Sequence, residues 1–369
     1  MSKENGAAQE NKIIHIALVG CGRISNNHIK AILYHKKQAK LVALCDTNKD
    51  NLESTCELIN KETQNFSQYI PPRLYSDFDF LLEENKEQKI NIDLIVLATP
   101  SGLHAPLTIK AARSGINVCT EKPMATNWED AKEMIKECKS ANVKLFVVKQ
   151  NRFNATIKLL KKQVESNRFG KISLVTVNVF WQRPQSYYDR DEWRGTWALD
   201  GGALMNQESH YVDLLYWLNG DIKSISAQSA TIGRNIEVED TLTMNILWDN
   251  GSLGTMAVTM LTYPENIEGS FTILGEKGSV RIGGKSVNTI DFWKFEDQHD
   301  DDLEIERCNT EPKNIYGFGH YMFYKNILDD LQGGDKAICS GDEGLKSLEI
   351  IVAAYKSVLT GEKINLPLT

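Results

Sequence analysis

The sequence predicts two α/β domains: an N-terminal domain on a doubly wound parallel sheet, and a C-terminal α+β domain on a large, mostly antiparallel open sheet. Up to residue 150, short β-branched apolar runs alternate with segments of helical periodicity, which is typical of βαβ units. Beyond residue 150, long runs alternate apolar and polar residues with period two, as antiparallel strands do. The 369 residues, 41% of them hydrophobic, suffice for two globular cores.

The N-terminal elements follow one another in strand–helix order. Apolar runs predict strands at residues 13–19, 40–45, 93–98, 116–119 and 144–148. Helices are predicted after the first glycine turn up to residue 35, and at 49–61, 103–114 and 128–141. We therefore assign residues 13–150 to one domain with right-handed connections. Residues 1–12 are assigned to a flexible tail, because this segment is polar and lacks the apolar centre of a signal peptide.

Residues 151–369 are assigned to the second domain, for substrate binding and oligomerisation. Alternating runs predict strands at 172–181, 222–232, 240–248, 252–262, 270–274, 279–282 and 289–295. Helices are expected at 155–166, 204–218, 321–331 and 343–359. The Asn-Gly pair at 250–251 and the Glu-Lys-Gly segment at 276–278 predict turns. The acidic stretch 296–306 is interpreted as a solvated loop.

The composition excludes several classes of protein. The net charge is −7 and the basic residues are scattered, so we expect no nucleic-acid partner. No apolar run approaches the roughly 20 residues that span a bilayer, so no membrane segment is expected. The seven cysteines include no CxxC pair, which favours a reduced, cytoplasmic setting. The histidines lack zinc-type spacing, so no metal is expected.

A glycine-rich turn follows the first predicted strand. Gly20, Gly22 and Ser25 form a G-x-G-x-x-S pattern that opens a helix, where backbone amides stabilise a pyrophosphate. Asp46 ends the next strand and is expected to bind the adenosine ribose hydroxyls and to repel a 2′-phosphate. These residues predict a Rossmann fold that binds NAD rather than NADP. A tight turn without any ligand is the alternative.

Two further segments end strands at the same edge of the sheet, where ligands bind in such folds. Thr-Pro-Ser at 99–101 follows one strand, with His104 just after it; a structural loop is the alternative. Glu-Lys-Pro at 121–123 follows the next strand. Partial burial beside a nicotinamide lowers the pKa of Lys122 whereas Glu121 raises it, so this lysine can deprotonate or orient a sugar hydroxyl. An ordinary exposed lysine is the alternative. The bond before Pro123 is a candidate for the cis form.

Asn206 and His210 are four residues apart on a predicted helix and are expected to share a face. Asp213, about one turn further, is a candidate to orient the imidazole. Histidine suits proton transfer near neutral pH, which makes His210 a second candidate base. A structural histidine on the buried face is the alternative.

Together these motifs resemble the glucose-fructose oxidoreductase/inositol dehydrogenase/MocA (Gfo/Idh/MocA) family. The likeness covers nearly the whole chain and is carried by GCGRIS at 20–25, Asp46, TPSGLH at 99–104, EKP at 121–123 and NQESH at 206–210. The resemblance implies that Lys122 and His210 act at the hydride-transfer centre, and it leaves open which of them is the base. The family often has Asp where this chain has Asn206, which cannot act as a base and is expected to bind substrate or position His210.

Longer stretches resemble the WlbA type of this family. They are VKQNRFNAT at 148–156, NVFWQRPQSYYDRDEWRGTW at 178–197, RNIEVEDT at 234–241, VTMLTYPENIEGSFTILGEKG at 258–278 and YGFGH at 316–320. The resemblance implies NAD-dependent oxidation of the C3 hydroxyl of UDP-N-acetyl-2-amino-2-deoxy-D-glucuronate, in bacterial surface polysaccharide (O-antigen) synthesis. It also implies a PLP-dependent aminotransferase that takes the 3-keto product, and a homotetramer.

The predicted site comprises two sets of residues. The cofactor is expected at Gly20, Gly22, Arg23, Ile24, Asp46, Thr99, Pro100, Ser101, His104, Glu121, Lys122 and Gln150. The substrate is expected at Lys122, Asn151, Arg152, Arg183, Tyr187, Trp193, Asn206 and His210. Guanidinium groups pair with a diphosphate or a uronate carboxylate, and aromatic rings pack on uracil or sugar faces. A surface loop with aromatic packing is the alternative for these arginines and rings.

Two other functions are compatible with parts of the sequence. An NAD-dependent dehydrogenase of a free polyol or aldose, such as inositol, would keep the same motifs, but a neutral polyol needs few arginines in the 183–197 stretch. A catalytically silent NAD-binding regulator would have no need of both Lys122 and His210.

Overall fold

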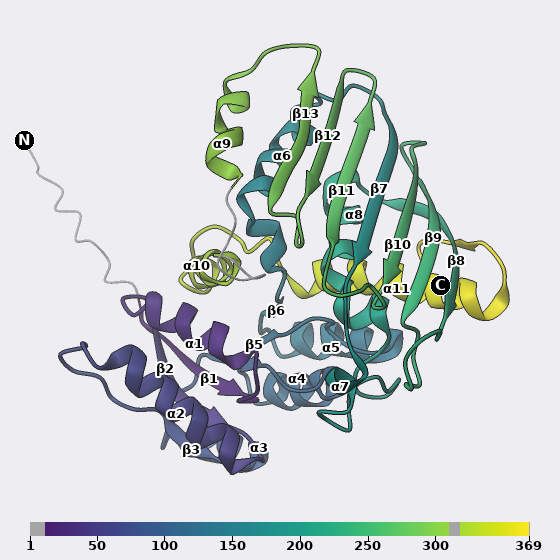
Figure 1. Cartoon of the computed structure of the whole chain (residues 1–369). Helices are drawn as coiled ribbons and strands as arrows, with labels where there is room; N and C mark the ends of the chain where they lie inside the picture. Colours follow the sequence, from purple (N-terminus) through teal and green to yellow (C-terminus); the bar gives the residue numbers. More distant parts are fainter. Residues whose placement is uncertain (1–11, 310–317, 369) are drawn as a thin grey trace, which may run out of the picture.

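The computed structural model describes residues 12–309 and 318–368 (Figure 1). Apart from Lys12, the tail expected at residues 1–12 lies outside the described residues, as do Tyr316 and Gly317 of the YGFGH stretch. No helix within the described ranges is long and apolar enough to cross a membrane. All seven cysteines are free thiols.

The first domain contains a six-stranded parallel sheet in the order β3-β2-β1-β4-β5-β6, which confirms the predicted doubly wound Rossmann fold. Its strands are β1 Ile14–Val19, β2 Ala39–Cys45, β3 Arg73–Tyr75, β4 Leu94–Leu97, β5 Asn117–Thr120 and β6 Leu145–Val147. Its helices are α1 Ser25–Tyr34, α2 Lys49–Thr63, α3 Phe78–Lys86, α4 His104–Arg113 and α5 Trp128–Ser140. The buried strands β4 and β6 are apolar throughout, as a sheet covered on both faces requires.

The sequence analysis did not predict β3 or α3. Strand β3 has three residues, of which only Tyr75 is buried, so it shows no apolar run. Helix α3 fully buries only Leu81 among its nine residues; Phe78 and Leu82 are half-buried on the same face, and the exposed Phe80 interrupts the apolar pattern. The Asp77 side chain caps α3 by accepting a hydrogen bond from the Phe80 amide, 2.7 Å away. An aspartate at the N-cap was therefore the sequence signal from which this helix could have been predicted.

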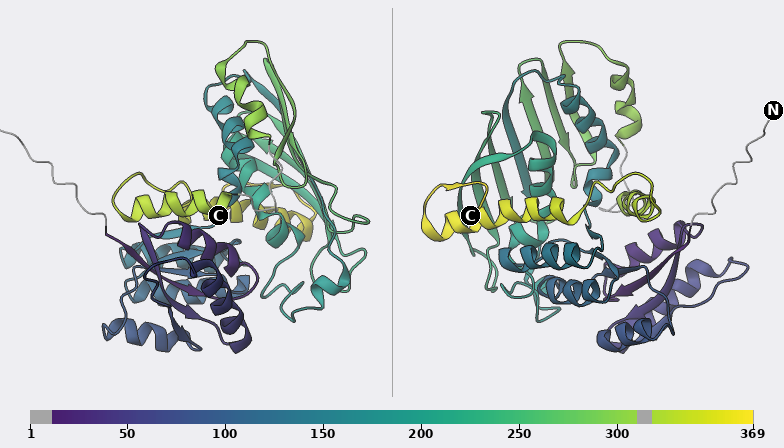
Figure 2. Two further views of the ribbon diagram at one scale, coloured as in Figure 1. Left: turned by 60° about the vertical axis from the view of Figure 1, so that its left-hand side comes forward. Right: turned by 180° about the vertical axis from the view of Figure 1, so that it is seen from behind.

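The second domain contains an eight-stranded sheet in the order β13-β12-β11-β7-β10-β9-β8-β14. Only the central pair β7 and β10 is parallel; the other neighbours are antiparallel, which confirms the predicted mostly antiparallel sheet. The strands are β7 Ile172–Phe180, β8 Ile222–Ala230, β9 Thr241–Trp248, β10 Leu253–Thr259, β11 Glu268–Gly275, β12 Gly278–Gly283, β13 Thr289–Phe295 and β14 Ile364–Asn365. Within the described residues, helices α6 Ala155–Glu165, α8 Ser209–Asn219 and α11 Gly341–Thr360 lie against one face and leave the other without a helix (Figure 2).

The C-terminal segments connect the two domains. Helix α10, Gly319–Leu331, packs against α1 of the first domain and contributes Phe323 and Ile327 to its core. Helix α11 lies between α5 and the second sheet, and a short bridge pairs Phe146 with Ser340 (Figure 1). The chain beyond residue 318 therefore contributes to both domains, which a single boundary at residue 150 does not describe.

The helix expected at 204–218 is not continuous. A π-helical turn, Ala203–Gln207, comes first, and α8 begins only at Ser209. The Glu208 amide bonds to the Ala203 oxygen, five residues back, at 3.0 Å, so one extra residue is inserted before α8. The prediction that Asn206 and His210 lie on one continuous α-helix is therefore wrong, although both residues line the same cleft between the domains.

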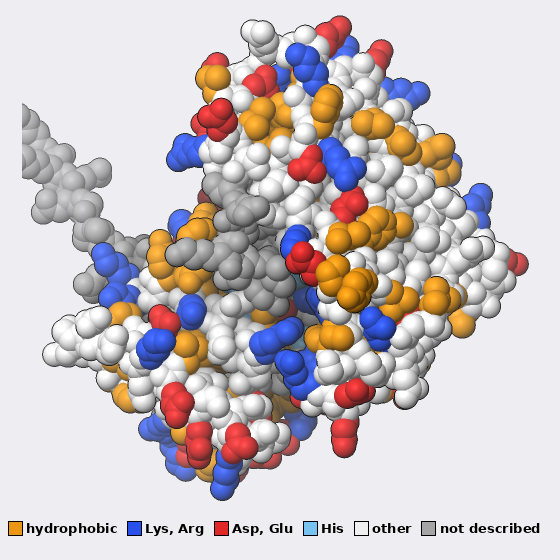
Figure 3. All heavy atoms as spheres, in the orientation of Figure 1, with side chains coloured by type: hydrophobic (Ala, Val, Ile, Leu, Met, Phe, Trp, Pro, Cys, Tyr) orange, Lys and Arg blue, Asp and Glu red, His pale blue; other side chains and the backbone are white. Residues whose placement is uncertain are grey.

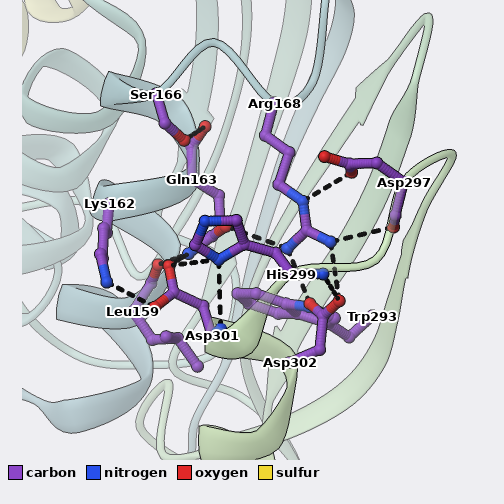
Figure 4. A network of polar contacts seen from close by, with 10 residues as sticks. All are labelled: Leu159, Lys162, Gln163, Ser166, Arg168, Trp293, Asp297, His299, Asp301 and Asp302. Carbon is purple, nitrogen blue, oxygen red and sulfur yellow. Dashed lines mark hydrogen bonds and ion pairs between the residues drawn. The ribbon is translucent and has the colours of Figure 1, made fainter.

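The acidic stretch 296–306 is not a solvated loop. It contains a short 3₁₀-helix, Asp300–Glu304, and the one-turn helix α9, Ile305–Cys308. The Asp302 carboxylate accepts two hydrogen bonds of 2.7 Å from the buried guanidinium of Arg168 (Figure 4). Asp301 pairs with Lys162 and Gln163 of α6 in the same network. These acidic residues attach the segment to α6 and to Arg168 just after it, and the bidentate guanidinium–carboxylate pair is strong and directional.

Candidate active site

A cleft of about 1240 Å³ lies between the two domains. One wall is the carboxyl edge of the parallel sheet, and the other is formed by residues 181–194 and 206–210 of the second domain. Lys and Arg side chains gather where the two domains meet (Figure 3). The structure brings most predicted site residues to this cleft: Gly20, Gly22, Arg23, Ile24, Asp46, Thr99, Pro100, Ser101, Glu121, Lys122, Gln150, Arg183, Tyr187, Trp193, Asn206 and His210.

The glycine turn after β1 has the geometry of a phosphate cradle. Gly20 has φ +93°, and a Cβ there would lie 2.6 Å from the carbonyl carbon of Ala98. A Cβ on Gly22 would meet no atom within 4 Å, so its backbone faces the open cleft. The Ser25 hydroxyl is buried and donates to the Gly22 oxygen at 2.6 Å. A pyrophosphate can therefore approach the backbone and the N-terminus of α1.

Asp46 at the end of β2 shapes this cradle. Its carboxylate accepts a hydrogen bond of 2.7 Å from the Cys21 amide and one of 2.8 Å from the Asn48 amide. The carboxylate therefore holds the glycine turn and the start of α2 together beside the cleft. Its negative charge there is unfavourable for a 2′-phosphate.

His104 is predicted as a cofactor contact but does not line the cleft. Its side chain is 1% exposed, with Nδ1 2.8 Å from the Pro123 oxygen and Nε2 3.0 Å from the Thr99 oxygen. Burial lowers the pKa of His104, although these two hydrogen bonds act to raise it. It connects the loops after β4 and β5, so its contribution is to position cleft-lining neighbours.

Lys122 is held by the second domain. Its Nζ donates to the backbone oxygen of Asn206 at 2.7 Å and lies 3.3 Å from Asn206 Oδ1. The peptide bond to Pro123 is cis. Burial lowers the pKa of Lys122, and the charges of Glu121, Glu208 and Asp200 oppose this effect.

His210 faces the cleft from the first turn of α8. Its Nε2 lies 2.9 Å from the Gln150 amide nitrogen, and its ring is 8% exposed. Burial, reinforced by the charge of Lys122, holds the pKa of His210 well below its usual range. The imidazole is therefore neutral at neutral pH and has the capacity to accept a proton.

Asp213 does not orient His210, contrary to the prediction. Its carboxylate accepts hydrogen bonds of 2.7 and 2.8 Å from Arg152 and one of 2.7 Å from Ser347. Burial acts to raise the pKa of Asp213, but the charges of Arg152 and Lys149 outweigh it and hold that pKa well below its usual range. The spacing of three residues did not bring Asp213 to His210, because both carboxylate oxygens of Asp213 accept hydrogen bonds from the buried Arg152.

Asn151 and Arg152 lie outside the cleft lining. The Arg152 guanidinium is 1% exposed and is engaged by Asp213 and, at 2.8 Å, by Glu343. This geometry gives no support to the prediction that Arg152 meets an anionic group of a substrate. The guanidinium instead joins η2, the short helix Gln150–Phe153, to α8 and α11.

The second-domain wall combines arginines, aromatic rings and amides. Arg183 donates to Gln207 Oε1 at 2.9 Å, and Arg194 donates to the Tyr187 hydroxyl at 2.8 Å. The wall also includes polar residues that were not among the predicted site residues, such as Gln182, Arg190, Gln207 and Asn266. All four fall inside the WlbA-like stretches 178–197 and 258–278 or the NQESH motif, so the motifs themselves were the available signal.

A Rossmann sheet with an open glycine turn, an acidic residue after β2, and Lys122 and His210 across one cleft defines a nicotinamide-dependent oxidoreductase. The family models agree: residues 14–149 match the NAD-binding Rossmann fold of the Gfo/Idh/MocA oxidoreductases, and residues 161–366 match their C-terminal alpha/beta domain. The chain belongs to the Gfo/Idh/MocA oxidoreductase family.

Solved structures and curated relatives include close and distant members. The WlbA dehydrogenase from Bordetella pertussis, solved with NADH and UDP-GlcNAcA, is 50% identical with a TM-score of 0.90, over 97% of this chain and 99% of that one. The WlbA enzyme from Chromobacterium violaceum, with the same two ligands, is 47% identical with a TM-score of 0.88 over 100% of both chains. A myo-inositol 2-dehydrogenase from Thermotoga maritima is 25% identical over 96% of this chain and 98% of its own length.

Proposed function

We propose that this protein is an NAD-dependent dehydrogenase that oxidises the C3 hydroxyl of UDP-N-acetyl-2-amino-2-deoxy-D-glucuronate to a 3-keto sugar. The observation that carries the proposal is the 50% identity, over nearly the whole of both chains, to a WlbA dehydrogenase whose structure holds NADH and UDP-GlcNAcA. The second supporting observation is a cleft whose two walls differ in chemistry, one suited to a dinucleotide and the other to an anionic sugar.

The residues of the first domain fit NAD. The open backbone at Gly22 and the N-terminus of α1 would hold the pyrophosphate, and Asp46 would bind the adenosine ribose. In the strand order, Asp46 directly after β2 and the residues after β4 and β5 lie on opposite sides of the turn after β1. The nicotinamide half therefore belongs over β4 and β5, beside Thr99, Glu121 and Lys122.

The second-domain wall fits the sugar nucleotide. Arg183 and Arg190 are placed to pair with the diphosphate or the uronate carboxylate, and guanidinium forks match both groups. The rings of Tyr187 and Trp193 offer flat apolar surfaces for the uracil or the sugar. A substrate held on this wall lies between the second domain and the nicotinamide half of the cofactor.

The reaction removes a proton from the C3 hydroxyl and a hydride from C3. Bound NAD supplies the hydride acceptor. Lys122 and His210 are the candidate proton acceptors, and burial lowers the pKa of both, which favours their neutral forms. Asn206 and Gln150 hold these two groups by hydrogen bonds, so the orientation is established before the sugar binds.

The wider setting follows from the same substrate. A 3-keto sugar nucleotide is a substrate for a PLP-dependent aminotransferase, and we propose that the product passes to one during O-antigen synthesis. We place the protein in the cytoplasm, where sugar nucleotides and reduced cysteines occur. We further propose a homotetramer that uses the helix-free face of the second sheet, where Leu253 and Phe292 are more than half exposed.

Oxidation of a free polyol is the second candidate, favoured by the full-length match to the myo-inositol 2-dehydrogenase. The arginines of the second-domain wall argue against it, because a neutral polyol leaves their charges unpaired.

The test is a single-turnover reaction of protein, NAD and UDP-N-acetylglucosaminuronic acid in equal amounts, followed by mass spectrometry of the sugar nucleotide. Equal amounts make product visible even when NADH stays bound. We expect a sugar nucleotide lighter by two hydrogens that depends on both protein and NAD, and inhibition by UDP. Unchanged substrate with myo-inositol oxidised under the same conditions would transfer the assignment to the polyol.

A further inference from the structure

A buried hydrogen-bonded chain lies behind the proposed nicotinamide position. His28 of α1 lies between Tyr324 of α10 and Glu121 after β5: its Nδ1 is 2.9 Å from the Tyr324 hydroxyl, and its Nε2 is 3.0 Å from Glu121 Oε1. His320, also on α10, has its Nε2 3.8 Å from the same oxygen. Glu121 lines the cleft with 6% of its surface exposed, and the other three side chains are at most 2% exposed.

With His28 neutral, the donors and acceptors in this chain have one consistent assignment. An ionised carboxylate only accepts hydrogen bonds, so His28 Nε2 carries the hydrogen that Glu121 receives. His28 Nδ1 then accepts from the Tyr324 hydroxyl. The second oxygen of Glu121 accepts the Lys122 backbone amide at 3.1 Å. Burial acts to raise the pKa of the Glu121 carboxyl, but the hydrogen bonds from His28 and His320 outweigh it and hold that pKa well below its usual range.

The position of this carboxylate relative to the cofactor follows from the strand order. Glu121 lies at the carboxyl end of β5, on the opposite side of the glycine turn from Asp46. It shares the cleft with Lys122 and His210, where the hydride is transferred in the proposed function. The oxidised nicotinamide ring carries a positive charge and the reduced ring carries none. A buried negative charge at this end of the cleft therefore interacts differently with the two forms.

We propose that His28 and Tyr324 hold Glu121 as a buried anion that makes the site bind NAD⁺ more tightly, relative to NADH, than it otherwise would. The inference rests on the proposed placement of the nicotinamide over β4 and β5. Glu121 acts as a binding residue and His28 and Tyr324 act as positioning residues. Because α10 follows β13 in sequence, the C-terminal part of the chain thereby contributes to the redox balance of a site in the first domain.

A metal ion is the competing interpretation of the same residues. His28, Glu121 and His320 are the one group of His, Cys, Asp and Glu side chains in the described ranges whose ligand atoms lie close enough to hold one. Both ring nitrogens of His28 already have protein partners at hydrogen-bond distance, so the chain is satisfied without an ion. Metal analysis of the purified protein distinguishes the two interpretations.

The experiment measures dissociation constants of NAD⁺ and NADH by titration calorimetry, in the absence of sugar, for the wild type and three variants. Glu121→Gln should shift the ratio of the two constants roughly tenfold against NAD⁺, the effect of one opposite charge on the order of 10 Å away at an effective dielectric constant of about 20. Tyr324→Phe removes only the terminal donor and should shift the ratio in the same direction by less. Glu349→Gln is the control, because Glu349 is a buried carboxylate that accepts a backbone amide of Leu368 at 2.7 Å.

The outcomes separate this inference from the proposed function. Two folded variants that bind both nucleotides with the wild-type ratio would overturn the inference and leave the dehydrogenase assignment intact. Failure of the wild type to bind either nucleotide would overturn the proposed function itself. One equivalent of tightly bound metal, lost in the Glu121→Gln variant, would replace the hydrogen-bonded chain with a metal site. If Glu121→Gln does not fold, the ratio of the two dissociation constants in Tyr324→Phe still tests the inference, because that variant leaves the carboxylate in place and removes only its support through His28.

Discussion

The Nζ atom of Lys122 lies 2.7 Å from the backbone oxygen of Asn206, a residue 84 positions further along the chain in the other domain. The π-helical turn before α8 places that oxygen, and the Asn206 carboxamide oxygen, over the lysine. The Asn206 carboxamide nitrogen in turn donates to Asp200. The orientation of the carboxamide is thus determined from both sides, and the domain interface positions the proposed base.

Replacing Lys122 by Ala should lower kcat by roughly 10²- to 10⁴-fold, the usual contribution of a positioned acid–base group. The measurement is the rate of NADH formation with UDP-N-acetylglucosaminuronic acid. NAD⁺ affinity should change much less, because the pyrophosphate and adenosine sites are intact. Lys158→Ala, an exposed lysine on α6, serves as the control. A Lys122→Ala enzyme with a near-normal rate would exclude Lys122 as the base.

His210→Asn tests the second candidate. A large loss of kcat is expected whether the imidazole accepts the proton or holds the sugar, and the pH profile separates these roles. Because burial and Lys122 hold the pKa of His210 well below its usual range, an imidazole that acts as the base should produce an ionisation in the wild-type rate well below pH 6.5 that disappears in His210→Asn. An imidazole that only holds the sugar should produce no such ionisation. His15→Asn, at the opposite end of β1 from the cleft, is the control. Near-normal rates in both His210→Asn and Lys122→Ala would contradict the whole catalytic assignment.

Asp46→Asn tests the cofactor preference. The amide oxygen still accepts the Cys21 amide, so the turn is preserved, but the negative charge that opposes a 2′-phosphate is lost. The ratio of kcat/KM for NAD⁺ to that for NADP⁺ should fall by about tenfold or more. Asp50→Asn, in the first turn of α2, should leave the ratio unchanged. An unchanged ratio in Asp46→Asn would mean that another group rejects the phosphate.

Glu208 provides a prediction on stability. Both of its carboxyl oxygens are buried with no hydrogen-bond partner within the described residues. Burial raises the pKa of Glu208 to about 8, although the charges of Arg183 and Lys122 act to lower it. The folded protein therefore holds a proton that the unfolded chain releases near its ordinary pKa of 4.5. Its contribution to stability is fully present below that value and is lost as the pH rises through about 8.

Glu208→Gln removes this titration. The unfolding free energy of the wild type should fall by up to about 1.4 kcal/mol per pH unit relative to the variant in that window. Thermal melts at pH 5 and pH 8 should show the variant gaining stability over the wild type at the higher pH only. Glu276→Gln, at an exposed position, should show no such difference. Parallel curves for wild type and Glu208→Gln would mean that the carboxyl is ionised or solvated in the folded protein.

Patterns local in sequence predicted the parallel sheet, most strands of the second sheet and the glycine turn. Each of these predictions rests on the spacing of apolar residues or on a short motif, and both give the same local backbone structure in most proteins. The short elements β3 and α3 were not predicted, because each fully buries only one residue, Tyr75 in β3 and Leu81 in α3, and so gives a weak apolar pattern. The pairing of β7 with β10 as the one parallel pair of the second sheet also depends on the path of the whole chain.

At the site, the sequence by itself determined which residue types were present: the glycine turn, Asp46, and the Glu-Lys-Pro and Asn-Gln-Glu-Ser-His motifs. Only the tertiary structure decided their partners. Arg152 pairs with Asp213 and does not line the cleft. The residue inserted before α8 places the backbone oxygen of Asn206 at hydrogen-bond distance from Lys122. The His28–Glu121 contact joins residues 93 positions apart. Spacing along one helix cannot encode such contacts, because a buried charge takes whichever opposite charge the packing of distant elements brings within hydrogen-bond distance.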